Sequence, residues 1–234
     1  MNFDSIFQAY YNLYRSEAII PTSTDDEYTI ALRLANEAIN RWANYDNVYW
    51  SQLFDTFQNS GDGTTIATGV TAYDGPGDMR EAGGIIKVVD SGGNTVQTYA
   101  LLEPQEAQFK IDEGRYAYFT GDPNNGFTLN LNPAPPSALN GMNIDFVYYK
   151  TPTLLTTGSD VPEMANPYFI VHRMLANRFR SSRNPYYQTA LHDSEDMLRI
   201  MQAENNSGSY GNPWKLQDNS GASFGNSTPG SWSW

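Results

Sequence analysis

The sequence predicts an α+β fold: a helical bundle with an inserted small antiparallel β-domain and an extended C-terminal arm. Apolar residues recur every three or four positions in two separate blocks, which is typical of helices. Between these blocks, apolar and polar residues alternate, as they do in strands. These patterns place the helical body in residues 1–52 and 151–204, the inserted β-domain in 53–150 and the arm in 205–234.

The first helical block has two predicted helices. Residues 2–14 carry aromatic side chains at helical spacing, and a polar stretch after Pro21 interrupts the pattern. A second helix is predicted over about 24–45, with Thr24 as its N-cap and Glu27 completing a capping box. One apolar stripe follows a period of three to four residues, at Tyr28, Leu32, Ala35, Ile39 and Trp42.

The middle of the chain predicts five to seven short strands. Residues 85–89 and 95–102 are strand-like and are joined by Ser91-Gly92-Gly93-Asn94, a favourable hairpin turn. Alternation returns around 116–118, 127–131 and 144–148, with turns every 8–12 residues, so a small barrel or sandwich is expected. Residues 53–58 fit either a helix end or a first strand.

Two helices are predicted near the end of the folded region, over 167–181 and 185–204. Each begins with Asn-Pro-Tyr, which places an asparagine at the cap and a proline at the first helical position. The predicted buried positions of the first are Tyr168, Val171, Leu175 and Phe179, and those of the second are Tyr187, Leu191, Leu198 and Met201. The short connection predicts an antiparallel hairpin.

Composition excludes several classes of function. The chain has no cysteine, so disulfides and the usual zinc sites are excluded. No apolar run approaches the ~18 residues that a membrane helix needs, so no membrane association is expected. The formal net charge of −12 argues against a dedicated nucleic-acid-binding protein, because such proteins carry an excess of Lys and Arg.

A search for catalytic and metal sites yields weak candidates only. Ser223 lies in a Gly-x-Ser-x-Gly string, but within the arm rather than between a strand and a helix. His172 and His192 could form a metal pair, although two surface imidazoles are the simpler interpretation. Asp74, with Asp78 and Glu81, could bind calcium or lie on a solvated turn. We therefore expect no enzyme activity, no metal and no cofactor.

The clearest charged feature is a group of four arginines, Arg173, Arg178, Arg180 and Arg183, within eleven residues of an acidic chain. Helical geometry turns Arg173 and Arg180 away from the predicted apolar stripe. Two interpretations stay open: the arginines complement the helix dipole and pair with carboxylates of the same chain, or they contact a neighbouring subunit.

The arm combines low complexity with aromatic residues. Seventeen of its thirty residues are Gly, Ser or Asn, a composition that cannot offset the entropy cost of ordering. Yet it holds three of the chain's five tryptophans, Trp214, Trp232 and Trp234. We predict that these rings anchor the arm in a partner protein.

The order of these features resembles the head-to-tail adaptor (connector) proteins of tailed bacteriophages. The resemblance covers about residues 25–204. Its N-terminal part comprises Ala38-Ile39-Asn40-Arg41-Trp42, the segment 53–58, and Thr71–Arg80 leading into Ile85–Val89. Its C-terminal part comprises Phe146-Val147-Tyr148-Tyr149-Lys150, Asp160-Val161-Pro162-Glu163-Met164 and the helical pair. Gly75 stands where an apolar residue is expected before Pro76.

The resemblance implies a structural ring, usually of twelve copies, that joins the phage portal to the tail at the head-tail junction. Implied partners are other copies of the chain, the portal protein and a tail tube or nozzle protein, with DNA passing through the lumen without sequence-specific binding. For the tryptophans of the arm, the portal is the first choice of partner and a neighbouring copy is the second. The protein would be assembled in the host cytoplasm and carried in the virion. A carbohydrate- or receptor-binding virion module, using exposed tyrosines of the β-region, is the alternative.

Overall fold

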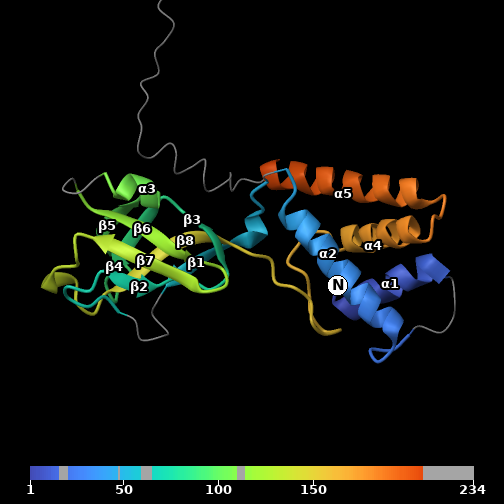
Figure 1. The fold of residues 1–234 in the computed structure, drawn as a ribbon, viewed down its shortest axis with the longest axis horizontal. Helices are drawn as coiled ribbons and strands as arrows, with labels where there is room; N and C mark the ends of the chain where they lie inside the picture. Colours follow the sequence, from blue (N-terminus) through green and yellow to red (C-terminus); the bar gives the residue numbers. More distant parts are fainter. Residues whose placement is uncertain (16–20, 47, 59–64, 110–113, 208–234) are drawn as a thin grey trace, which may run out of the picture. The chain divides into compact units, whose positions relative to one another are not determined.

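The computed structural model describes residues 1–15, 21–46, 48–58, 65–109 and 114–207 (Figure 1). The chain forms two compact units. The first combines Met1–Phe54 with Thr151–Gly208 and carries the long helices, and the second is Asp55–Lys150 and carries the sheet.

The predicted fold class, a helical bundle with a small antiparallel β-domain inserted, is wrong. The main feature is a curled mixed sheet of eight strands that forms a half-barrel, accompanied by a few helices. Sequence reasoning underestimated the sheet because β2 (Ala72–Asp74) and β3 (Met79–Ala82) are only three and four residues long. Such segments are too short to display the alternation that identifies a strand.

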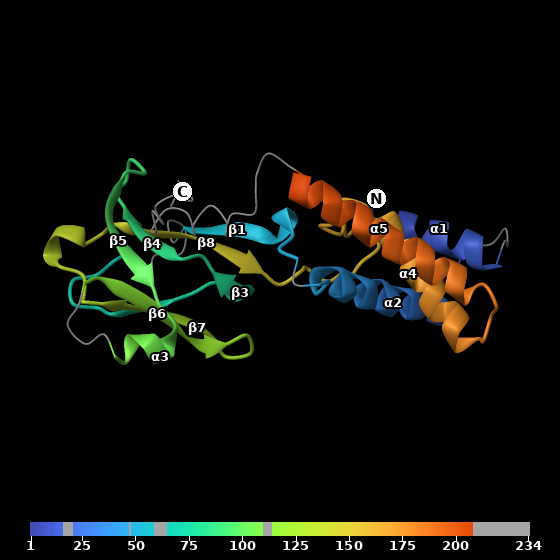
Figure 2. The ribbon, with the colours of Figure 1, turned by 90° about the horizontal axis from the view of Figure 1, so that it is seen from above.

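Four helices make up most of the first unit, and α4 lies against the other three. Figures 1 and 2 both show α4 and α5 side by side, as the short connection between them predicts. The helices are α1 (Phe3–Arg15), α2 (Asp26–Ala43), α4 (Tyr168–Ser181) and α5 (Tyr187–Ser207). Because it has neighbours on several sides, α4 buries more than one stripe, and Phe169, Ile170, Val171 and Met174 are fully buried.

Aromatic side chains fix α1 in this unit. The rings of Phe3 and Phe7 both meet the Tyr28 ring of α2 edge to face, with centroids 5.1 and 5.0 Å apart. The Tyr28 hydroxyl donates to Asp4 at 2.8 Å. This explains why residues 2–14 carry aromatic residues at helical spacing: they form the buried face of α1.

Several predicted details of the helix ends differ in the structure. No capping box forms at α2, whose N-cap is Asp25 rather than Thr24. Glu27 cannot return the capping bond, since it pairs with an arginine of α4. Asn166 and Asn184 accept the amide hydrogens two residues ahead, at 3.1 and 2.9 Å. The predicted cap positions are nevertheless wrong, because Pro167 is the N-cap of α4 and α5 begins only at Tyr187. The expected burial of Tyr168 is wrong, as half of this side chain is exposed.

The sheet of the second unit has the order β1-β8-β4-β5-β6-β7-β2, and β3 also pairs with β8. Its strands are β1 (Phe54–Gln58), β2 (Ala72–Asp74), β3 (Met79–Ala82), β4 (Ile85–Val89), β5 (Thr95–Leu101), β6 (Tyr116–Asp122), β7 (Gly126–Asn132) and β8 (Asn143–Lys150). Strands β5 and β6 run parallel, with α3 (Pro104–Ala107) in the connection between them. This parallel pair makes the sheet mixed, and it needs a crossover connection of the kind that contains α3.

Two hairpins are fixed by aspartate-anchored turns. Asp90 accepts the amide hydrogens of Gly92 and Asn94 in the predicted β4–β5 turn, each at 2.9 Å. Asp122 does the same for Asn124 in the β6–β7 turn, at 2.8 Å. These polar segments were recognisable in the sequence because Asp and Asn side chains stabilise turns by hydrogen bonding to backbone amides a few residues ahead.

The core of the sheet comes from the inward faces of its strands. Phe146 of β8 is 1% exposed, and its ring lies 5.0 Å from Phe57 and 5.4 Å from Phe119. Further buried side chains include Ile86, Val88, Tyr99, Leu129, Leu131 and Ile144. The sheet is thus closed around its own apolar core rather than being a minor addition to the helices.

Candidate functional site

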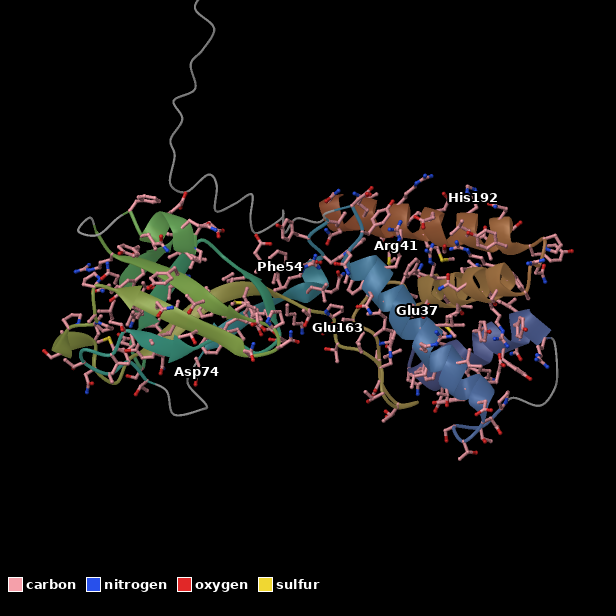
Figure 3. All side chains as sticks on the ribbon, viewed as in Figure 1. Glu37, Arg41, Phe54, Asp74, Glu163 and His192 are labelled. Carbon is pink, nitrogen blue, oxygen red and sulfur yellow. The ribbon has the colours of Figure 1, made fainter. Side chains whose placement is uncertain are left out.

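In the described part of the chain, the residues considered as metal ligands do not come together in one site. No group of three or more His, Asp or Glu that could hold a metal ion occurs among residues 1–15, 21–46, 48–58, 65–109 and 114–207. His172 pairs with Asp193 at 3.5 Å and His192 with Asp196 at 3.2 Å, so the two histidines lie in separate pairs. Figure 3 shows His192 on α5.

The remaining candidates from the sequence are also dispersed or undescribed. Asp78 accepts a hydrogen bond from the Tyr148 hydroxyl at 3.0 Å and so braces the sheet. Asp74 is an exposed residue of β2, and Glu81 is exposed on β3. Ser223 lies outside the described residues. None of the described helices is long and apolar enough to cross a membrane.

Arg173 is part of an ion pair inside its own chain. Its Nη1 lies 2.9 Å from Glu195 Oε1 of α5, and the same oxygen lies 3.5 Å from Arg41 Nη2 of α2. Figure 3 shows Arg41 on α2. Arg173 retains only 20% side-chain exposure, so the expectation that it faces outward is wrong. Glu195 instead links three helices, a role that sequence spacing could not reveal.

Arg178 is likewise held by groups of the same unit. It pairs with Glu27 at 3.0 Å, donates to the Tyr14 hydroxyl at 3.2 Å and lies over the Tyr14 ring, 5.3 Å from its centroid. Because Tyr14 belongs to α1 and Glu27 to α2, Arg178 ties α4 to both helices. Burial, reinforced by the negative charge of Glu27, raises the pKa of neighbouring Tyr10 well above its ordinary value of 10.0.

Arg180 and Arg183 differ from the other two. Both side chains are exposed, and within the described residues no carboxylate pairs with either. Arg183 lies just beyond the C-cap of α4 in the left-handed region, at φ 54°, and the Asn184 amide donates to Phe179 O at 2.9 Å. This is the usual hydrogen bonding of a helix C-terminus. Of the four predicted contact residues, these two keep charges free for a partner.

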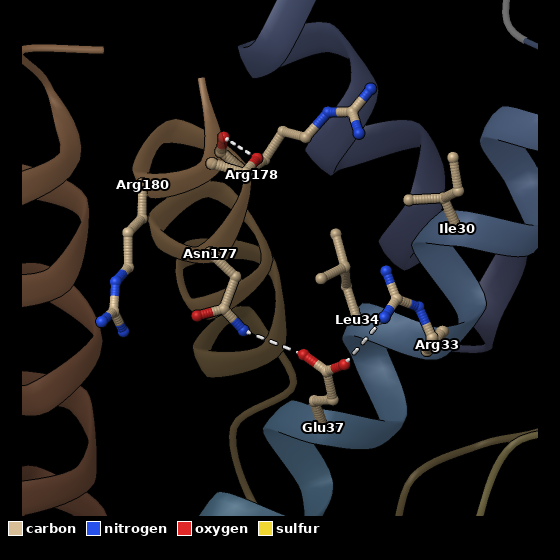
Figure 4. A pocket seen from close by; sticks show the side chains of 8 residues that line it. Ile30, Arg33, Leu34, Glu37, Asn177, Arg178 and Arg180 are labelled. Atoms are coloured by element: carbon tan, nitrogen blue, oxygen red, sulfur yellow. Dashed lines mark hydrogen bonds and ion pairs between the residues drawn. The ribbon is translucent and has the colours of Figure 1, made fainter. Parts of the chain in front are cut away.

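A hollow of about 470 Å³ lies between α2 and α4. We call it the α2–α4 hollow; it is lined by Ile30, Arg33, Leu34, Glu37, Asn177, Arg178, Arg180 and Ser181. Glu37 accepts a hydrogen bond from Asn177 of α4 at 3.5 Å and forms an ion pair with Arg33 of its own helix, also at 3.5 Å. Figure 4 marks both interactions with dashed lines. The guanidinium of Arg178 turns toward α1 in the same view.

The chemistry of the hollow suits binding rather than catalysis. Ile30 and Leu34 supply apolar surface, while Arg33 and Arg180 supply positive charge against the single carboxylate of Glu37. Arg33 is highly exposed, at 70% of its side chain. The sequence reasoning missed Arg33, although its position off the buried stripe of α2 indicated an exposed cation.

A second feature that the sequence reasoning missed is an exposed apolar residue on α5. Ile200 is 56% exposed, although the predicted stripe of this helix is satisfied by buried Leu198 and Met201. Its neighbours one turn away on the same face are Asp196 and Glu204. The pattern was readable in the sequence as an isoleucine between two carboxylates at four-residue spacing.

The three tryptophans predicted as anchors, Trp214, Trp232 and Trp234, lie outside the described residues. The structure therefore does not test the arm. Their partner assignment stays a prediction, as does the contact role of the arginines.

Comparison with known protein families gives one finding. The family model described as SU10 adaptor protein matches residues 1–216. The match thus includes both units. A search of curated proteins gives no match.

Proposed function

The chain belongs to the SU10 adaptor protein family, and from this premise we propose that it forms the ring that joins the phage portal to the tail. As a member of this family it is a structural adaptor of a bacteriophage and a component of the virion, where it associates with other phage structural proteins. The family match over residues 1–216 is the observation that carries the proposal. Families of structural adaptors are normally not enzymatic.

The finer features of the proposal are a ring of twelve copies at the head-tail junction, a tail tube or nozzle protein on the far side, and DNA passing through the lumen. Charge supports the last of these. With a net charge of −12 per copy, the ring repels phosphates, so DNA slides through without being held. Assembly would take place in the host cytoplasm.

A receptor- or carbohydrate-binding module loses its main support in the structure. That alternative relied on exposed tyrosines in the β-region. Tyr73, Tyr99, Tyr116, Tyr148 and Tyr149 are buried, and Tyr118 is half-buried. Among the described residues, the sheet therefore offers no platform of exposed tyrosine rings.

Portal binding tests the proposal directly. Purified chain should co-sediment with purified portal rings, and negative-stain images should show an added ring on one face of the portal. A chain that stays in the supernatant at micromolar portal concentration would contradict the proposed role. Bovine serum albumin is a suitable acidic control for nonspecific sedimentation.

The arm is proposed to contribute to this docking through Trp214, Trp232 and Trp234. Deleting residues 208–234 keeps α5 intact, including Asn205, whose amide donates to Tyr49 O at 2.9 Å. The shortened chain should fold with an unchanged helical circular dichroism signal but bind the portal more weakly, because large rings dominate such contacts. Equal binding of the shortened and full chains would remove the arm from the proposal.

A further inference from the structure

Positive charge is scarce in this chain, and two of the four clustered arginines are already paired within their own chain. Only 14 Lys and Arg residues stand against 26 Asp and Glu. Arg173 and Arg178 are held by Glu195 and Glu27 of the same chain. Arg180 and Arg183 remain, and of these two Arg180 lines the α2–α4 hollow together with Arg33.

The hollow combines this charge with apolar surface and sufficient room. Half-buried Ile30 and buried Leu34 line it, and its volume of about 470 Å³ accommodates several side chains. Arg33 shares the carboxylate of Glu37 in an exposed pair at 3.5 Å. Such pairs contribute little, so Arg33 can exchange partners at small cost.

The exposed surface of α5 around Ile200 carries carboxylates, whereas the hollow carries arginines. Ile200 projects an apolar side chain, and Asp196 and Glu204 lie one helical turn to either side. We call these three residues the α5 knob. Within its own helix, Asp196 forms ion pairs with His192 and Arg199. The side chains of His192, Asp196 and Arg199 are each about half exposed or more, so these two ion pairs are also weak.

From this complementarity we propose that the α5 knob of one copy docks into the α2–α4 hollow of the next copy. Ile200 meets the apolar surface of Ile30 and Leu34, and the knob carboxylates meet Arg33 and Arg180. Because hollow and knob are different surfaces, the contact is head-to-tail and can propagate from copy to copy, and it gives a ring when the rotation between neighbouring copies closes. The inference rests on the proposed function only in assuming that copies of the chain assemble.

Charge gives a physical reason for this choice of partner. Copies that each carry −12 repel one another, so a stable contact must place the few available cations against carboxylates. The hollow and the knob achieve this. The portal is the competing occupant, and the experiments below separate the two.

Cysteine cross-linking tests the contact without disturbing its charges, since the natural chain has no cysteine. One copy carries Ser181→Cys at the hollow and a second copy carries Ala203→Cys, an exposed position beside the knob. After mild oxidation of the mixture, alone and with portal rings, a disulfide between the two copies should form at least five times faster than in a control pair. The control pairs Ser181→Cys with Glu106→Cys, an exposed position in the other unit.

Charge exchange provides a second, independent test. Copies with Arg33→Glu and Arg180→Glu should not assemble with themselves, and neither should copies with Asp196→Lys and Glu204→Lys. An equal mixture should assemble, because reversed knobs then meet reversed hollows and native knobs meet native hollows. Lys87→Glu, an exposed change in the sheet unit, is the matched control and should assemble normally.

Three results would overturn the inference. The first is cross-linking no faster than in the control pair, and the second is failure of the mixture to assemble while each variant keeps the native circular dichroism spectrum. The third is that the variant with Arg33→Glu and Arg180→Glu assembles normally by itself but no longer binds portal. The last result would assign the hollow to the portal. If the native chain does not bind portal but its copies cross-link as expected, the proposed function fails and this contact stands.

Discussion

The pair of Arg178 and Glu27 should contribute far more to stability than the similar pair of Arg33 and Glu37. The first pair is 3.0 Å apart with side chains 23% and 18% exposed, whereas the second is 3.5 Å apart with side chains 70% and 48% exposed. Arg178 also donates to Tyr14 at 3.2 Å. Removing Arg178 thus affects two partners in a largely buried setting.

The size of the effect follows from burial. Removing one member of a fully buried pair costs about 3–5 kcal/mol, and an exposed pair contributes about 0–1 kcal/mol. Glu27 Oε1 is already buried without a hydrogen-bond partner among the described residues, so loss of Arg178 strands the whole carboxylate. We expect Arg178→Met to lower the free energy of unfolding by about 2–3 kcal/mol, and the control Arg33→Met by about 0.5 kcal/mol or less.

Urea unfolding followed by circular dichroism at 222 nm measures this difference, because the long helices dominate the signal. A double-mutant cycle with Glu27→Gln isolates the coupling between the two residues. Equal effects of Arg178→Met and Arg33→Met, or a coupling energy near zero, would refute the reasoning.

Three further predictions concern the two units. Phe146→Ala should destabilise the sheet unit by about 3–5 kcal/mol in thermal unfolding, because the ring is 1% exposed, while Phe109→Ala, 86% exposed, should change stability by about 0.5 kcal/mol or less. Gly158→Ala should cost about 1 kcal/mol in urea unfolding, because an added Cβ would push the Asp4 carboxylate away from the Tyr28 hydroxyl that donates to it; Gly77→Ala, with open space around it, is the control. Hydrogen bonds from Thr156 and Thr157 lower the pKa of Asp160 from 3.8, so its stabilisation is present above that pH and is lost as pH falls below it. Asp160→Asn should therefore flatten the acid side of the stability curve measured by thermal unfolding, and an unchanged slope would contradict this.

The long elements of the fold were predictable because their periodicity is local. The aromatic face of α1 and the apolar stripe of α2 identify both helices, and Asp90 with Gly92 and Asn94 identifies the β4–β5 turn. The sequence reasoning failed for β2 and β3, which have three and four residues. Their place in the sheet depends on partners about 55–70 positions away, which local patterns do not encode.

The candidate site was predictable only in part, for a similar reason. Clustering in the sequence identified the four arginines, but the carboxylates that hold two of them are distant: Glu27 lies 151 residues from Arg178, and Glu195 lies 22 residues from Arg173. Only the folded chain separates the internally paired Arg173 and Arg178 from Arg180 and Arg183. Arg33 joins Arg180 through packing of α2 against α4, which no spacing along the sequence indicates.

Cryo-electron microscopy of the intact virion tests the central claim most directly, because it places the chain in the particle. The account predicts a closed ring of this chain between portal and tail, with one unit recognisable by its four long helices and the other by its eight-stranded sheet, around a lumen that DNA can pass. Density for the chain on the capsid surface or at the distal tip of the tail, with none at the head-tail junction, would contradict it.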